Sequence, residues 1–113
     1  MNLLGSEAEK LAAKFLQQQG LTLITSNFNC RFGEIDLVMR DEKTLVFVEV
    51  RLRSAQAFGG AGGSITLSKQ QKLIRTAEYY MQLHGSDACR FDAILMHKPA
   101  VENIEWIRNA FDA

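Results

Sequence analysis

Three carboxylates interrupt two apolar segments near the middle of the chain. Glu34, Asp36 and Glu49 lie in GEIDLVMRDEKTLVFVEVRLR, residues 33–53, with Arg51 two residues after Glu49. Both segments are otherwise rich in aliphatic and β-branched residues, which are typical of strands. Carboxylate oxygens are ligands for hard divalent cations, and a guanidinium group binds phosphate oxygens. The residues therefore suggest metal or phosphate chemistry on a sheet.

A β-hairpin would position these side chains. Residues 34–40 and 45–52 are predicted to be strands that are joined by a short loop at DEKT. If the loop has an even number of residues, opposed positions sum to 85 and the aliphatic side chains share one face. An odd loop would mix acids and aliphatics on both faces, which burial disfavours. The even register places the following residues on one face: Ile35, Leu37, Met39, Val46, Val48 and Val50.

The same register sets Asp36 opposite Glu49 and Glu34 opposite Arg51. Directly opposed like charges destabilise a sheet. A proton, a cation or a separation of the two side chains must relieve the repulsion between Asp36 and Glu49, and a divalent cation does so directly. In the alternative interpretation, Arg51 neutralises Glu34 while solvent screens Asp36 from Glu49.

The remaining elements predict an α/β or α+β sheet with helices packed against it. A helix is expected over residues 6–19, with Ser6 and Glu9 at the spacing of a capping box. A second helix is expected from a cap at Ser68 to a stop at Gly85. Further strands are expected at 21–25, 89–96 and near 104–107. The 113 residues fit a single domain, 1–113, with one modest core.

The bulk composition limits the partners and the compartment. The formal net charge is zero, so any binding of nucleic acid must depend on a local basic patch. No apolar run is long enough for a membrane span, and the first residues do not resemble a signal peptide. We therefore expect a cytoplasmic protein with no membrane partner. Cys30 and Cys89 are expected to be reduced thiols.

A basic stretch follows the second acidic strand. Between Val50 and Ala77 all the charged residues are basic: Arg51, Arg53, Lys69, Lys72 and Arg75. A Lys in the first turn of a helix opposes the helix dipole, which suggests a nearby anion. We expect Arg31, Arg53, Lys69, Lys72 and Arg75 to contact DNA phosphates. An ordinary solvated helix face is the alternative. The Gly-rich segment 58–64 is expected to form a mobile loop at the mouth of the site.

Several motifs together resemble a known family. They are AEKLAAKFLQQQG, SNFNCRFGEIDLV, LVFVEVRLRS, AFGG, SITLSKQQKLIRTA, CRFDAILM and IEWIRNAF. They resemble the YraN-like family of small bacterial proteins, which are generally labelled as endonucleases. That family is similar to archaeal Holliday-junction resolvases and to the PD-(D/E)xK nuclease core. The resemblance implies a restriction-endonuclease-like fold, in which helices flank a central mixed β-sheet. It also implies hydrolysis of DNA, branched DNA included, with Mg²⁺ or Mn²⁺, and it makes a homodimer plausible.

The resemblance also implies roles for individual residues. Asp36 and Glu49 match the metal-binding acids, and Glu9 matches an acid that reaches the metal site, although a capping box would explain Glu9 equally well. Arg51 stands where the nuclease core most often has Lys. Arg stays charged under all useful conditions, so it cannot act as a general base, but it can hold a phosphate oxygen. Alternatively, Lys69 supplies the lysine function.

Three classes of function remain open at this point. The first is a metal-dependent nuclease, which the opposed acids and Lys69 favour. The second is a non-catalytic nucleic-acid-binding module that keeps the nuclease-like fold. The third is a protein-interaction domain without a nucleic-acid partner. Arg51 and the zero net charge favour the second and the third.

Overall fold

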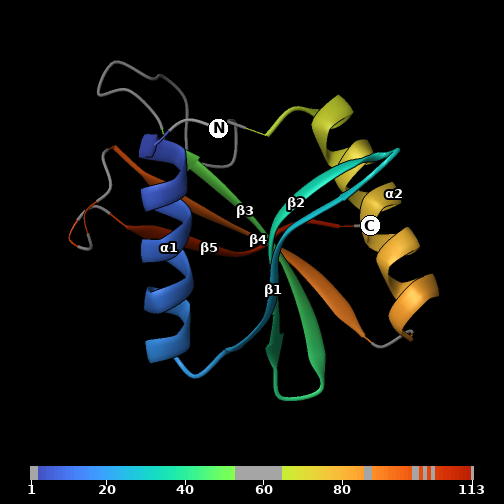
Figure 1. Ribbon diagram of the computed structural model, residues 1–113, viewed down its shortest axis with the longest axis horizontal. Coiled ribbons are helices and arrows are strands. Elements are labelled where there is room, and N and C mark those ends of the chain that lie inside the picture. The colour runs from blue at the N-terminus through green and yellow to red at the C-terminus, as the bar shows by residue number, and fades with distance from the viewer. Residues whose placement is uncertain are drawn as a thin grey trace.

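In a computed structural model, the chain is described over residues 3–52, 65–85, 88–97, 100, 102 and 104–112. Two helices and five strands make up this part of the chain (Figure 1). Their order is α1 (Leu3–Gln18), β1 (Thr22–Cys30), β2 (Gly33–Asp41), β3 (Thr44–Leu52), α2 (Leu67–His84), β4 (Cys89–Met96) and β5 (Glu105–Phe111).

The five strands form one mixed sheet in the order β1-β2-β3-β4-β5. β3 and β4 are parallel, and the other neighbouring pairs are antiparallel. Figure 1 shows α1 on one face of the sheet and α2 on the other. This is the predicted α/β architecture of a central mixed sheet flanked by helices, and it is consistent with a restriction-endonuclease-like fold.

Each helix buries its apolar stripe against its own face of the sheet. Ala8, Ala12 and Leu16 of α1 pack with one set of strand residues, which are Leu37, Met39, Val46, Val48, Ile94 and Met96. Leu73, Ala77 and Tyr80 of α2 pack with the opposite set, which includes Val38, Leu45, Phe47 and Phe91. Alternation along β2 and β3 thus supplies both cores, because successive strand side chains point to opposite faces.

The predicted hairpin register is confirmed over its paired length. Leu37 pairs with Val48, Met39 with Val46, and the ladder continues to Asp41 and Thr44. The loop is the two-residue turn Glu42-Lys43, and Glu42 has a positive φ of 55°, as tight hairpin turns require. The aliphatic side chains therefore share a face from Leu37 onward.

Ile35 departs from the prediction. Ile35 is fully buried in the core beneath α2, against which the half-buried Phe28 packs, and it is not on the face of Leu37. β1 and β2 pair at Ser26–Leu37 and at Phe28–Ile35, and Asn27, with a φ of 55°, stands between these two pairs. The register is the same on both sides of Asn27, and the shift in register lies between Leu23 and Thr25. On β2 the alternation of faces breaks between Ile35 and Leu37, which lie in opposite cores. The end of the β1–β2 hairpin consequently reaches over α2 (Figure 1).

The expected helix starts are wrong by two or three residues. α1 begins at Leu3, so Ser6 lies inside the helix and the Ser6–Glu9 capping box does not form. α2 is capped by Thr66, not Ser68: Thr66 Oγ1 accepts a hydrogen bond of 3.1 Å from the Lys69 backbone N–H. Sequence patterns locate helix ends poorly because several nearby polar residues can serve as the cap. The predicted stop at Gly85 is confirmed.

One of the three further predicted strands has the predicted bounds, and two are longer. The strand at 89–96 is confirmed, whereas β1 and β5 extend well beyond the predicted 21–25 and 104–107. Both cysteines are free thiols. Within the described ranges, no helix combines the length and apolar character that a membrane crossing requires. Arg53 and the Gly-rich segment 58–64 lie outside the described residues.

Candidate functional site

Asp36 and Glu49 lie side by side where β2 leaves its ladder with β3. The last paired positions of that ladder are Leu37 and Val48. One residue further, Asp36 Oδ2 accepts a hydrogen bond of 2.8 Å from the Val50 backbone N–H. Glu49 is buried, with 6% of its surface exposed. The sheet therefore presents two adjacent carboxyl groups in a mostly dehydrated position.

The environment strongly favours a proton on Asp36. Burial is the main cause, and the neighbouring charge of Glu49 adds to it; together they raise the pKa of Asp36 from 3.8 to about 8, against the opposing hydrogen bond from Val50. Asp36 also hydrogen-bonds to the Glu49 side chain, which requires a proton on one of the two carboxyl groups. The repulsion expected from the hairpin register is thus present, and a proton on Asp36 relieves it.

Two cations contact Glu49. Arg51 Nη1 lies 3.6 Å from Glu49 Oε2, and Lys69 Nζ lies 3.4 Å from the same oxygen. Lys69 comes from the first turn of α2, which Thr66 caps, so a helix that follows β3 in the chain contributes to the site. The predicted pairing of Glu34 with Arg51 is wrong. Because the β2–β3 ladder ends at Leu37, Glu34 no longer stands opposite Arg51, and Arg51 turns to Glu49.

Glu9 extends the acidic group from α1. Burial is the main cause that raises its pKa; a hydrogen bond with Asn27 opposes the shift, and the charges of Glu34 and Glu49 add to it. Glu9 and Asn27 line a cavity of about 160 Å³ between α1 and the sheet, together with Ser6, Lys10, Ala13, Leu23, Ser26 and Leu37. Asn27 Oδ1 is buried without a hydrogen-bond partner. The capping box does not form, and Glu9 lies close enough to Asp36 and Glu49 for their charges to interact.

The donor set fits a hard divalent cation in part. Asp36 and Glu49 offer adjacent carboxylate oxygens, which Mg²⁺ and Mn²⁺ prefer. No group of three or more His, Cys, Asp or Glu side chains suited to holding a metal occurs in the described portion of the chain. Mg²⁺ is nevertheless commonly held by one or two carboxylates, with water and substrate phosphate as the other ligands. Two adjacent carboxylates would therefore hold such an ion only together with water or phosphate ligands.

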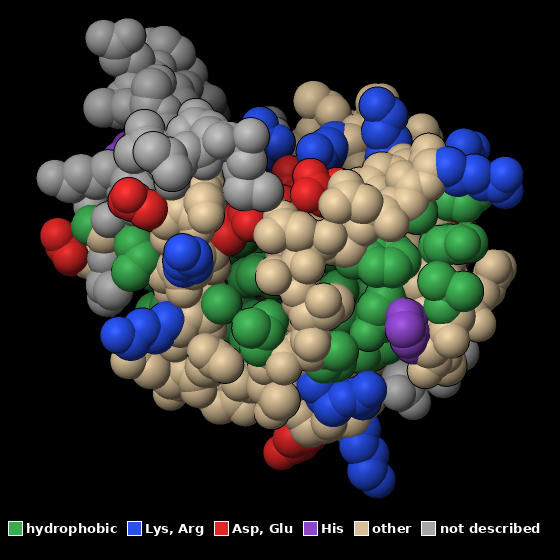
Figure 2. All heavy atoms as spheres, viewed as in Figure 1, with side chains coloured by type: hydrophobic (Ala, Val, Ile, Leu, Met, Phe, Trp, Pro, Cys, Tyr) green, Lys and Arg blue, Asp and Glu red, His purple; other side chains and the backbone are tan. Residues whose placement is uncertain are grey.

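Of the predicted basic residues, Lys69 contacts the acid Glu49, and three others lie on α2 or in the β1–β2 turn. Lys72 and Arg75 are exposed on α2, beyond Lys69 along the same helix, and Arg31 is exposed in the turn between β1 and β2. Figure 2 shows acidic side chains gathered at the upper middle of one face, with Lys and Arg side chains above them and toward the upper right. A phosphate held by Lys69 would therefore lie close to the carboxylates.

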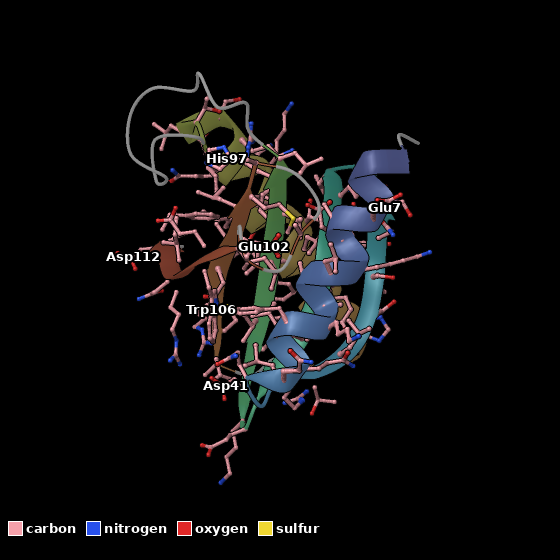
Figure 3. All side chains as sticks on the ribbon, turned by 90° about the vertical axis from the view of Figure 1, so that its left-hand side faces the viewer. Glu7, Asp41, His97, Glu102, Trp106 and Asp112 are labelled. Atoms are coloured by element: carbon pink, nitrogen blue, oxygen red, sulfur yellow. The ribbon has the colours of Figure 1, made fainter. Side chains whose placement is uncertain are left out.

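A further buried acid has a different environment. Asp92 is fully buried on β4, and its carboxylate accepts hydrogen bonds from Arg90 Nε at 3.0 Å, Trp106 Nε1 at 2.9 Å and the Asn109 backbone N–H at 2.9 Å. Arg90 also contacts Asp41 at 3.0 Å. Figure 3 shows Trp106 and Asp41 below the middle of the sheet, with His97 toward its opposite end. Asp92 has its hydrogen bonds satisfied within the fold, so it is a structural acid.

Asn27 is the site residue that the sequence analysis missed. Its neighbours in SNFNC are mostly polar, so residues 26–30 were not expected to continue the strand. One available signal was Asn itself, since it tolerates a positive φ better than most residues. A strand that contains Asn between alternating half-buried positions can bend at that residue.

Comparison with known proteins gives the family. Residues 8–96 match the family model described as Uncharacterised protein family UPF0102. A UPF0102 protein of Nitrosomonas europaea is 61% identical over 109 residues, covering 96% of this chain and 92% of the relative. The UPF0102 protein of Methylobacillus flagellatus is 58% identical over 113 residues and covers 100% of both chains. That of Stutzerimonas stutzeri is 48% identical, covering 96% and 94%. The chain belongs to the UPF0102 family.

Proposed function

We propose that this chain is a Mg²⁺- or Mn²⁺-dependent endonuclease that hydrolyses phosphodiester bonds in DNA. The observation that carries the proposal is the arrangement around Glu49. Its carboxylate lies beside Asp36, whose pKa is raised to about 8, and within 3.4 Å of Lys69 Nζ. Strongly shifted carboxyl groups beside a cation are common at catalytic sites, because a plain structural acid is usually stabilised in its charged form.

Asp36 and Glu49 would hold the divalent ion. When bound, such an ion lowers the pKa of water and polarises a phosphoryl oxygen. Lys69 is placed to orient the attacking water or to donate a hydrogen bond to it, since its ammonium group already lies against Glu49. Arg51, from the same strand, would hold a non-bridging phosphate oxygen and stabilise the charge that develops there. In this assignment Lys69 supplies the function that nuclease cores more often place on the strand.

DNA would approach along α2. Lys69, Lys72 and Arg75 follow one another along that helix, and phosphate contacts from Lys and Arg provide most of the sequence-independent affinity of proteins for DNA. The resemblance to resolvases extends the proposal to branched DNA and to a homodimer.

A non-catalytic DNA-binding module is the second candidate. Arg51 and Lys69 both contact Glu49 Oε2, so two cations already offset its charge without a metal ion. In that interpretation the acids position the cations, and the cations bind DNA. The two candidates differ in whether DNA is cut and in whether the acids bind metal.

A cleavage assay separates them. Labelled linear, flapped and four-way DNA would be incubated with the protein in Mg²⁺, in Mn²⁺ and in EDTA. We expect metal-dependent cleavage by the wild type, none by Asp36→Asn or Glu49→Gln, and full activity from Glu7→Gln, an exposed acid on α1. Binding of DNA without cleavage under every condition would support the module. Absence of Mg²⁺ and Mn²⁺ binding by calorimetry, with or without DNA, would refute the nuclease.

A further inference from the structure

A second cavity lies between the β1–β2 turn and α2, and the proposed chemistry does not use it. Its volume is about 260 Å³, slightly below the range of about 300 to 1,000 Å³ that is typical of small-molecule pockets. It is large enough for one planar group. Its lining residues are Arg31, Phe32, Arg75, Glu78, Tyr79 and Gln82.

Flat side chains form one part of this cavity. The half-buried rings of Phe32 and Tyr79 have centroids 6.0 Å apart at an interplanar angle of 63°. The guanidinium carbon of Arg31, which is exposed, lies 4.8 Å from the centroid of the Phe32 ring. Aromatic rings and guanidinium planes are the surfaces on which unpaired nucleic-acid bases stack.

Two cations, one carboxylate and one amide complete the lining of the cavity. Arg31 and Arg75 suit the phosphates on either side of a nucleotide. Glu78 would repel a bare anion such as inorganic phosphate, but its carboxylate can accept a hydrogen bond from the amino group of a base. Gln82 can both donate and accept. This combination fits a base with its flanking phosphates better than it fits an anion alone.

The bend in the β1–β2 hairpin connects this cavity to the acid pair. It carries the turn onto α2, where a Cβ on Gly33 would lie only 3.1 Å from Thr76 Oγ1. The backbone of Gly33 thus approaches α2 closely, next to the contact between the Phe32 and Tyr79 rings. Tyr79 follows Lys69 by ten residues on α2, which is about 15 Å of helix axis. A strand whose phosphate meets Lys69 can therefore reach the cavity within a few nucleotides, past Lys72 and Arg75.

We propose that the cavity lined by Phe32, Tyr79, Arg31 and Arg75 binds one unpaired base of a DNA strand that also contacts Lys69. This assignment rests on the proposed function and deepens it, because it defines the substrate class as DNA with an unpaired nucleotide near the cleaved bond. Fully paired duplex would leave the cavity empty.

The test measures binding without cleavage. A duplex with a single bulged 2-aminopurine and the matched fully paired duplex would be titrated with wild-type protein in EDTA, and the affinity ratio recorded by fluorescence anisotropy. We expect tighter binding of the bulged duplex. Phe32→Leu should reduce that ratio about fivefold or more, since base stacking is worth about 1 to 3 kcal/mol per base. Phe32→Tyr should preserve the affinity ratio. The fluorescence of the bulged 2-aminopurine should indicate stacking in the wild type and in Phe32→Tyr, and not in Phe32→Leu.

Matched controls make the outcome specific. Phe111→Leu removes a half-buried ring on the opposite edge of the sheet and should leave the ratio unchanged. The surface variant Arg31→Gln, which does not touch the core, should reduce the ratio, whereas Lys43→Gln should not. The variant Arg31→Gln keeps the test valid if the Phe32→Leu protein does not fold.

Three results would overturn the proposal: equal affinity of the wild type for both duplexes, a ratio unaffected by Phe32→Leu and Arg31→Gln, or binding of free dCMP as tight as that of the bulged duplex. A cleavage assay in Mg²⁺ on the same duplexes keeps the two proposals apart. Base-dependent binding without cleavage would refute the nuclease and retain the cavity, and cleavage without base-dependent binding would do the reverse.

Discussion

Asp36 Oδ2 accepts a hydrogen bond of 2.8 Å from the Val50 backbone N–H, one residue beyond the last paired positions of the β2–β3 ladder. The Asp36 side chain thus accepts the hydrogen bond of a β3 backbone N–H at the point where β2 and β3 cease to pair. The carboxyl groups of Asp36 and Glu49 lie next to each other at this point, and the β1–β2 hairpin beyond it packs against α2.

The stability of the metal-free protein should fall as pH rises from about 4 to about 8. The folded-state pKa of Asp36 lies above its ordinary value of 3.8, so over this interval the folded protein binds a proton that the unfolded chain has released. The loss should approach about 1.4 kcal/mol per pH unit at most. Asp36→Asn should flatten the profile and be at least as stable as the wild type near pH 8, because Asn still accepts a hydrogen bond from Val50 and can donate one to Glu49.

Urea unfolding in EDTA at several pH values measures this dependence of stability on pH. Glu7→Gln is the control, and parallel profiles for wild type and Asp36→Asn would contradict the prediction.

Asp92→Asn should have the opposite effect on stability. Asp92 is fully buried and ion-paired with Arg90, and it accepts hydrogen bonds from Trp106 and Asn109. Breaking such a buried pair typically costs about 3 to 5 kcal/mol. We expect a large decrease in the free energy of unfolding at neutral pH, measured as for Asp36→Asn. A loss below about 1 kcal/mol would show that Asp92 does not hold the strand pair together.

Glu9→Gln should weaken Mn²⁺ binding by about tenfold while leaving the fold intact. Glu9 lies close enough for the charge of Glu49 to raise its pKa, and groups that support metal ligands typically contribute 10- to 100-fold in affinity. Calorimetric titration of Mn²⁺ in the presence of DNA tests this. Glu7→Gln, on the same helix, is the matched control. Equal Mn²⁺ affinity in both variants would leave Glu9 with no part in the site.

Lys69→Met should lower the cleavage rate by on the order of a hundredfold, since positioned proton donors and acceptors commonly contribute that much or more. Lys72→Met removes an exposed cation one turn along the helix and should affect mainly DNA affinity.

Arg51→Lys should retain or raise the cleavage activity, because it keeps a cation beside Glu49, whereas Arg51→Met should reduce it. Single-turnover rates at saturating protein separate rate from affinity. If Arg51→Lys is as inactive as Arg51→Met, the site requires a guanidinium and the Lys69 assignment loses its basis.

Replacing Lys69, Lys72 and Arg75 together with Ala should weaken DNA binding at low salt and flatten its salt dependence. Each neutralised phosphate contributes about −0.9 to the slope of log affinity against log salt on duplex DNA, so the slope should become less negative by about 2 to 3. The exposed pair Lys14 and Lys43, replaced in the same way, should change the slope little. An unchanged slope in the triple variant would assign these residues of α2 to an ordinary solvated face.

The sequence by itself determined the parts of this protein that follow from local pattern. The alternation of Leu37, Met39, Val46 and Val48 fixed the hairpin register, because a shift of one residue would expose all of them. The stripe of Leu73 and Ala77 determined which face of α2 is buried. These predictions depend only on neighbours within a strand, a turn or a helix.

Only the tertiary structure decided which side chains meet at the site. The contact between Lys69 and Glu49 joins α2 to β3, and that between Glu9 and Asn27 joins α1 to β1. Ile35 lies in the core opposite to that of Leu37, and the β2–β3 ladder ends before Glu34 could stand opposite Arg51, although a regular strand pattern predicts otherwise. The hydrophobic pattern of a sequence predicts a regular strand. The strand departs from that pattern where Ile35 and Phe28 are buried against α2, and this packing depends on a helix that is remote in the sequence.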